Sequence, residues 1–348
     1  MSATLRILVR NFESDAFNRD RLDFASPLKL QFSDFSVEYL AQGSQQRLTY
    51  VKQFFPGAVF GECLIERQYQ SIPPIAGDYV GFGAISEEPE DLLSSLRLYR
   101  PGDLAFVGVT IEKAGRAPAV LYPYRVISTL VSDSTRQFTF KQEDVQQWET
   151  FDRALRLSPA WRAGWFKVAR RAFLYGSSDE FNANHEGMHD RVSYFFAALE
   201  ASLVPRTDFI QRCLKERAIA LLKFSGDEAS ATKKLLSDFY RIRSTLVHGS
   251  PLSEQQMGLL QDRDRWWKFE RLVRDLLVAA VKEIPPDDAS RRSFLAELYE
   301  PDDRARAEEI AMSFRAISDR SVRRGLLVTL KREFGMTGGW KDSSLGSE

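Results

Sequence analysis

Histidine and cysteine are scarce in this sequence of 348 residues, which contains three histidines and two cysteines. Cys63 and Cys213 lie about 150 positions apart, so neither a disulfide framework nor a cysteine zinc site is expected. No apolar run approaches the roughly 20 residues that a membrane-spanning helix needs. The N-terminus also lacks the cleavage pattern of a signal peptide. We therefore expect a cytoplasmic protein that does not contact a membrane.

A net charge is absent as well, because 48 basic side chains balance 48 acidic ones. The whole protein therefore has no field that attracts nucleic acid or an anionic membrane, and any such attraction must come from a local patch. Internal repeats and glycine-rich phosphate loops are also missing. What is present is a hydrophobic content of 44%, which is enough to bury a core.

Alternation of apolar and polar residues marks the first part of the chain, 1–147, as a β-rich domain. The alternating segments are separated by turn-forming residues and lie at 28–40, 47–55, 78–86 and 103–113. One segment differs, because Leu92, Leu93, Leu96 and Tyr99 recur at helical spacing after an acidic start. We predict a single helix there, inserted among the strands.

Near Gln147 the apolar period changes to about 3.6, which is typical of helices. The sequence thus predicts an α+β protein with a helical domain over 148–284, a helical extension over 285–334 and a mobile tail over 335–348. The helices expected in the helical domain are one through Val192 to Leu203 that Pro205 ends, one through Ile210 to Leu222, one from Asp227 to His248 capped by Gly249, and one from Ser253 through Ala280. Ser253 and Gln256 have the spacing of a capping box at the start of the last of these helices.

A zinc-protease pattern, His-Glu-x-x-His, occurs at His185 to His189. Its surroundings are unfavourable, because Gly187 weakens a helix and Asn182 and Asn184 favour a turn. Glu200 lies too far along the same expected helix to complete the site. We interpret this stretch as a polar loop that enters the following helix, and we expect no metal site and no cofactor.

A second pattern lies at the end of the helix that precedes Gly249, where Arg243-Ser244-Thr245-Leu246-Val247-His248-Gly249 follows an apolar helix. Upstream, Asp190-Arg191-Val192 and Leu199-Glu200 occur in the expected order and spacing. Together these residues resemble the Apea-like members of the HEPN superfamily, whose motif is Arg-x4–6-His. The resemblance covers about 150 to 283, and it implies a helical bundle that forms a homodimer through these helices.

The chemistry of the two side chains agrees with the RNA cleavage that the resemblance implies. An imidazole such as His248 can transfer a proton, and a guanidinium such as Arg243 can neutralise charge that develops on phosphorus. Arg241 also satisfies the spacing and lies close to the face of His248, so it stays a second candidate. Glu200 is the expected supporting carboxylate, and the resemblance adds Ser244 as an RNA contact.

A further candidate for RNA binding is the segment 161–176, in which Lys167, Arg170 and Arg171 alternate with aromatic residues. The other interpretation is an amphipathic helix that buries its apolar residues and leaves its basic face in solvent. The apolar residues in question are Trp161, Trp165, Val168 and Ala172.

Two functions remain open at this point. The first is a metal-independent endoribonuclease of a prokaryotic antiviral defence or toxin system, with RNA as substrate and a regulatory ligand or protein bound by the N-terminal domain. The second is a non-catalytic scaffold of the same family that binds a protein or a ligand.

Overall fold

The computed structural model describes twelve stretches of the chain. These are residues 3–10, 12–13, 29–31, 35–39, 53, 63–69, 88–102, 104–113, 119–122, 138–177, 185–205 and 210–301. The expected strands at 47–55 and 78–86, the last helices of the extension and the tail over 335–348 lie outside the described residues, apart from Gln53.

An antiparallel sheet occupies the N-terminal part of the chain, with strand order β3-β4-β5-β1-β6-β7. Its strands are β1 (Ala3–Arg10), β3 (Lys29–Gln31), β4 (Phe35–Tyr39), β5 (Cys63–Tyr69), β6 (Ala105–Lys113) and β7 (Ala119–Tyr122). Strand β1 is central and pairs with both β5 and β6, and Ile7 lies opposite Ile65 on one side and Val109 on the other. All three of these side chains are buried. Of the alternating segments predicted as strands, 28–40 contains β3 and β4, and 103–113 contains β6, whose Val109 and Ile111 are buried. Strands β1 and β5 lie outside those segments.

Two short strands, β2 (Phe12–Glu13) and β8 (Phe138–Thr139), form a separate parallel pair. The helix predicted among the strands is α3 (Glu88–Tyr99), and its Leu92, Leu93 and Leu96 are buried. The α+β class expected from the sequence is therefore confirmed.

Helices make up the described chain from Asp144 to Leu298. They are α4 (Asp144–Leu157), the 3-10 turn η1 (Pro159–Arg162), α5 (Gly164–Gly176), α6 (His185–Leu203), α7 (Ile210–Leu222), α8 (Gly226–Val247), α9 (Glu254–Gln261), α10 (Arg263–Glu283) and α11 (Asp288–Leu298). The change of period predicted near Gln147 is thus found a few residues earlier, at the start of α4.

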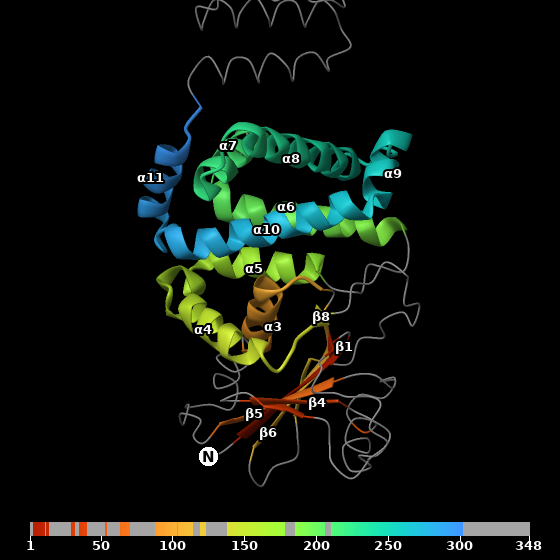
Figure 1. Cartoon of the computed structure of the whole chain (residues 1–348), viewed down its shortest axis with the longest axis vertical. Coiled ribbons are helices and arrows are strands. Elements are labelled where there is room, and N and C mark those ends of the chain that lie inside the picture. The colour runs from red at the N-terminus through yellow and green to blue at the C-terminus, as the bar shows by residue number, and fades with distance from the viewer. Residues whose placement is uncertain are drawn as a thin grey trace, which may run out of the picture.

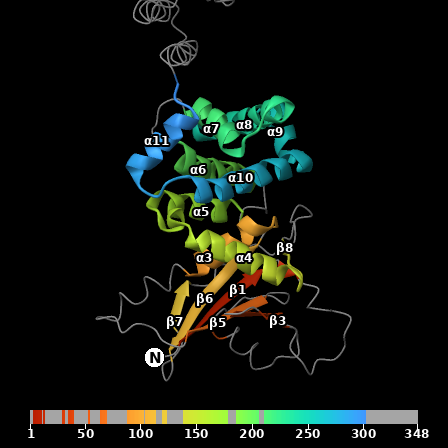
Figure 2. The same ribbon diagram turned by 60° about the vertical axis from the view of Figure 1, so that its left-hand side comes forward.

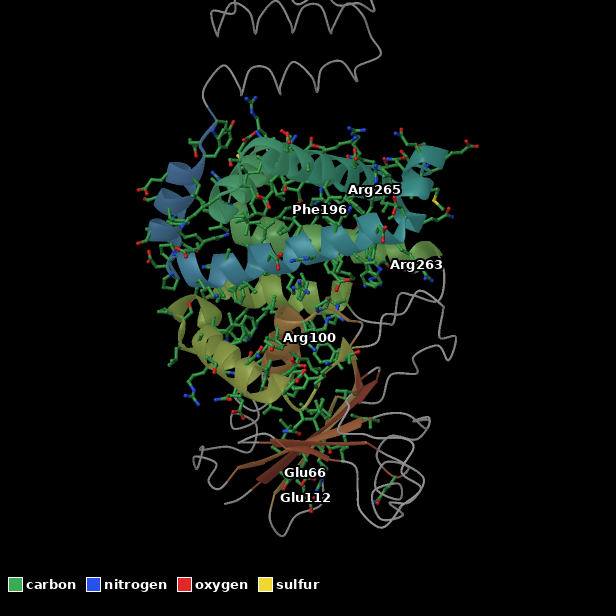
Figure 3. The ribbon with its side chains drawn as sticks, in the orientation of Figure 1. Glu66, Arg100, Glu112, Phe196, Arg263 and Arg265 are labelled. Carbon is green, nitrogen blue, oxygen red and sulfur yellow. The ribbon has the colours of Figure 1, made fainter. Side chains whose placement is uncertain are left out.

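The helices lie in successive layers above the sheet (Figure 1). Helices α3 and α4 lie next to the sheet, α5 follows, then α6 and α10, and α7 and α8 form the outermost layer; the turned view in Figure 2 shows the same order. The predicted apolar stripe of α6 is fully buried at Val192, Phe195, Phe196, Leu199 and Leu203. Phe196 lies between α6 and α8 in Figure 3, and the rings of Phe239 on α8 and Phe269 on α10 stack at 4.2 Å.

The last predicted helix of the bundle, from Ser253 through Ala280, is two helices in the structure. Asp262 interrupts it, because its extended backbone ends α9 and its carboxylate accepts a hydrogen bond from the backbone N–H of Arg265 at the start of α10. Aspartate is a strong N-cap residue, so the chain can turn at Asp262 without leaving that backbone donor unpaired. The capping box predicted at Ser253 and Gln256 is present.

A buried ion-pair cluster joins α3 to the helical layers. Arg97 of α3 donates to Glu270 of α10 at 3.1 Å, and their side chains are 0% and 3% exposed. Arg191 of α6 lies 4.0 Å from the other oxygen of Glu270 and above the ring of Trp266. The helix that the sequence assigned to the N-terminal domain therefore packs into the helical part.

None of the described helices combines the length and the apolar character needed to cross a bilayer.

Candidate functional site

His248 is the C-cap residue of α8, and its side chain is exposed. Its backbone N–H donates to the carbonyl of Ser244 at 3.2 Å, and the N–H of Ser250 donates to the carbonyl of Thr245 at 3.0 Å. Gly249 follows with a φ of 67°, a left-handed conformation that a glycine adopts without strain. Helix α8 thus ends where the sequence predicted, with the imidazole turned to solvent.

Arg243 lies between α8 and α6, where its side chain is 23% exposed. Its Nη2 donates to Oε2 of Glu200 at 3.0 Å, and its guanidinium carbon lies 5.5 Å from the centre of the Tyr240 ring. The Tyr240 ring meets the buried ring of Phe196 edge-on at 5.3 Å. A carboxylate and an aromatic ring therefore hold Arg243 between α8 and α6.

Burial raises the pKa of Glu200 above its ordinary value, and the neighbouring Arg243 offsets only part of this effect. The geometry shows the reason, because Oε1 of Glu200 is buried and accepts no hydrogen bond from the described residues. One carboxylate oxygen is therefore paired with Arg243, while the other loses its hydration without compensation.

This pKa shift predicts a pH-dependent stability that the Glu200→Gln substitution removes. A carboxyl group with a raised folded-state pKa contributes stability below its ordinary value of 4.5, and this contribution is lost as the pH rises through the folded-state value. Glutamine does not titrate. The melting temperature of the variant, relative to the unaltered protein, should therefore increase from about pH 4 to about pH 7. A difference in melting temperature that stays constant over this range would contradict the prediction.

Arg241 and Ser244, the other two candidates on α8, are placed differently. The side chain of Arg241 is 67% exposed and reaches Asp238 at 3.7 Å, a weak contact that leaves the guanidinium in solvent. Ser244 is half-buried, and its carbonyl accepts the N–H of His248. Arg241 is thus the more accessible arginine and Arg243 the more firmly held one.

Within the described residues, the imidazole of His248 makes no hydrogen bond or ion pair, either with Arg243 or with Arg241. An exposed imidazole can donate a proton to a reacting oxygen or accept one from it. The guanidinium of Arg243 keeps nitrogens beyond the one that binds Glu200, and these can donate to a phosphate. His248 can therefore transfer a proton at a phosphodiester, and Arg243 can bind its charged oxygens.

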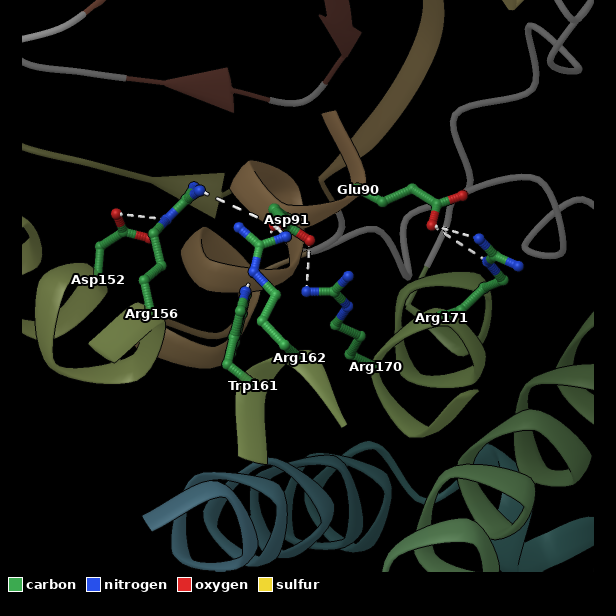
Figure 4. A network of polar contacts seen from close by, with 8 residues as sticks. All are labelled: Glu90, Asp91, Asp152, Arg156, Trp161, Arg162, Arg170 and Arg171. Carbon is green, nitrogen blue, oxygen red and sulfur yellow. Dashed lines mark hydrogen bonds and ion pairs between the residues drawn. The ribbon is translucent and has the colours of Figure 1, made fainter. Parts of the chain in front are cut away.

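The basic segment on α5 is largely neutralised by α3 (Figure 4). Arg170 is buried and forms an ion pair with Asp91, and its guanidinium lies 4.9 Å from the centre of the Trp161 ring. Arg162 approaches the same carboxylate at 3.2 Å. Arg171, whose side chain is 55% exposed, reaches Glu90 at 2.9 Å.

Arg170 is therefore too buried to contact RNA, contrary to the expectation from the sequence that it binds RNA. The physical reason is that Glu90 and Asp91, at the start of α3, cover this face of α5. Trp161, Trp165 and Ala172 are buried as expected, whereas Val168 is 59% exposed. Lys167 is half-buried, so Lys167 and Arg171 are the two RNA-binding candidates on α5 that keep access to solvent.

The histidine pair of the zinc-like pattern lies on a helix rather than in the predicted loop, because α6 begins at His185. The helix formed by the apolar residues after Asp190 thus continues upstream through Gly187 to His185. Among the described residues, no group of three or more histidine, cysteine, aspartate or glutamate side chains is arranged to hold a metal ion.

Gln256 of α9 also contacts the end of α8. The sequence indicates its role in the capping box but not this contact. Its Nε2 donates to Oγ1 of Thr245 at 2.8 Å and to the carbonyl of Arg241 at 3.4 Å. The capping-box spacing marked the residue, but its second amide atom has a partner on another helix, which spacing along the chain does not report.

A comparison of the chain with known proteins found no matching family model, no similar curated protein and no similar solved structure.

Proposed function

We propose that the chain is a metal-independent endoribonuclease in which His248 transfers a proton and Arg243 stabilises charge on the phosphorus. The observation that carries this proposal is the end of α8, where an exposed imidazole follows a guanidinium held by Glu200 at 3.0 Å. A fixed guanidinium needs little reorganisation when charge develops, so it acts as a preorganised donor.

The resemblance of this segment to the Apea-like HEPN motif supports the same assignment, and it implies a homodimer in a prokaryotic defence or toxin system. No hydrogen bond joins Arg243 to His248 within the described residues of one chain. A dimer that brings two copies of this pair to one cleft would supply both groups to the same phosphate. The sheet domain would then bind the ligand or protein that regulates cleavage.

Cleavage of total RNA by the purified protein in EDTA tests the proposal, and two arginine variants test the assignment of the site. Arg243→Ala should reduce the rate by about a hundredfold, the scale of one lost transition-state donor. Arg241→Ala should reduce it by less than about tenfold, because an exposed arginine adds mainly screened attraction.

Both rates are measured on one RNA, with thermal melts to verify folding. A larger loss in Arg241→Ala than in Arg243→Ala would assign the donor role to Arg241. Absence of cleavage at any concentration of the unaltered protein would favour the scaffold.

The scaffold keeps one observation in its favour. Because Arg243 is already paired with Glu200, this arginine also serves to join α8 to α6, and a structural role of this kind requires no substrate. In that case the helical domain would bind a protein or ligand without cleaving RNA.

A further inference from the structure

Gln256 connects the first turn of α9 to the last turns of α8. Its Oε1 accepts a hydrogen bond from the backbone N–H of Ser253 at 2.9 Å, and its backbone N–H donates to Oγ of Ser253 at 3.3 Å. These two bonds form the capping box, in which the side-chain oxygen of the glutamine is already engaged. The side-chain nitrogen Nε2 of Gln256 takes no part in the capping box and can donate to another group.

That nitrogen reaches across to α8. Nε2 donates to Oγ1 of Thr245 at 2.8 Å and to the carbonyl of Arg241 at 3.4 Å, and the Thr245 hydroxyl itself donates to the same carbonyl at 2.9 Å. The three groups form a small network on the last turns of α8, one turn before His248. Networks of this kind orient the groups at their ends more strongly than isolated bonds do.

The side chain of Gln256 thus binds on both sides of the connecting segment 248–253. Its Oε1 binds Ser253 at the end of the segment, and its Nε2 binds Thr245 in the last turn of α8. His248 begins this segment, and its own side chain has no partner within the described residues. The position of the imidazole therefore depends on how firmly the end of α8 is held. A free helix end opens locally at low cost, which would displace the ring.

We propose that Gln256, acting through Thr245, is a positioning residue that fixes the end of α8 and with it the place of His248. For catalysis this inference rests on the proposed ribonuclease function. The structural part of the inference does not depend on that function. It states that the hydrogen bonds from Nε2 of Gln256 to Thr245 and Arg241, which we call the clamp, hold the end of α8.

Two variants remove the clamp in different ways. Thr245→Val has nearly the same shape but lacks the hydroxyl, so it loses the bond to Gln256 and leaves the capping box of α9 intact. Gln256→Ala loses both the clamp and part of the cap. Gln255→Ala is the matched control, since Gln255 is the neighbouring glutamine of α9 and is exposed.

The first measurement is hydrogen exchange of the backbone amides of His248, Gly249 and Ser250 in the full-length protein. Both clamp variants should exchange these amides about tenfold faster, the scale of one lost hydrogen bond, whereas Gln255→Ala should not. The double variant should add little to the larger single effect, because both substitutions remove the same contact. Unchanged exchange in Thr245→Val and Gln256→Ala would overturn the inference.

The second measurement is steady-state RNA cleavage. Both variants should lower kcat by about tenfold and leave KM within about twofold, because a displaced imidazole impairs proton transfer but not RNA binding. A rise in KM at constant kcat would also overturn the positioning role. If the unaltered protein cleaves no RNA, the proposed function fails, and hydrogen exchange still decides whether Gln256 holds the end of α8.

Discussion

Replacing His248 with alanine is expected to reduce RNA cleavage by about a hundredfold or more, the scale of lost general acid-base help. The fold should survive, because the side chain is exposed and makes no hydrogen bond or ion pair within the described residues. Surface substitutions of this kind change the free energy of unfolding by about 0.5 kcal/mol or less. Measured on the same preparation, the cleavage rate should therefore fall while the melting temperature stays nearly unchanged.

The sequence provides matched controls for this experiment, since His185 and His189 are the other two histidines of the chain. Both belong to the first turns of α6, and neither is assigned to the proposed site. His185→Ala and His189→Ala should keep the cleavage rate of the unaltered protein. Full activity in a folded His248→Ala variant would end the ribonuclease proposal and leave the scaffold.

The largest expected effect on stability is that of Glu270→Gln, which removes the carboxylate from the cluster that joins α3, α6 and α10. Arg97 lies 3.1 Å and Arg191 4.0 Å from this carboxylate, and all three side chains are almost completely buried. Glutamine keeps the shape but leaves two buried guanidinium groups without this counter-charge. Breaking such a buried pair typically costs about 3 to 5 kcal/mol in the free energy of unfolding.

Denaturant unfolding measures this loss, and Glu283→Gln is the control, because Glu283 is the exposed last residue of the same helix. The control should differ from the unaltered protein by about 0.5 kcal/mol or less. Combining Glu270→Gln with Arg97→Met should cost less than the sum of the single changes, since both act on one interaction. An equally stable Glu270→Gln variant would show that the cluster does not hold α3 in place.

Helix and strand signals in the sequence were informative wherever they depend on neighbours within a few residues. The apolar spacing of α3, the stripe of α6 ahead of Pro205 and the glycine cap after His248 all correspond to the structure. The break between α9 and α10 was missed, because the apolar period continues across Asp262 and only the capping bond to Arg265 reveals the interruption. Strand β1 lies outside the alternating segments, because its Ile7, Leu8 and Val9 are consecutive apolar residues and do not alternate with polar ones.

By itself, then, the sequence determined the α+β class, most helices of the second half and the location of the Arg243 and His248 pair. Tertiary structure alone decided which side chains these residues meet. Glu200 reaches Arg243 from 43 residues away, and Glu90 reaches Arg171 from 81 residues away. Periodicity reports which face of an element is apolar, because it arises within one helix or strand. Ion pairs between elements depend on the order and angle at which those elements pack. For this reason the sequence did not reveal that Arg170 of α5 is buried against Asp91 of α3.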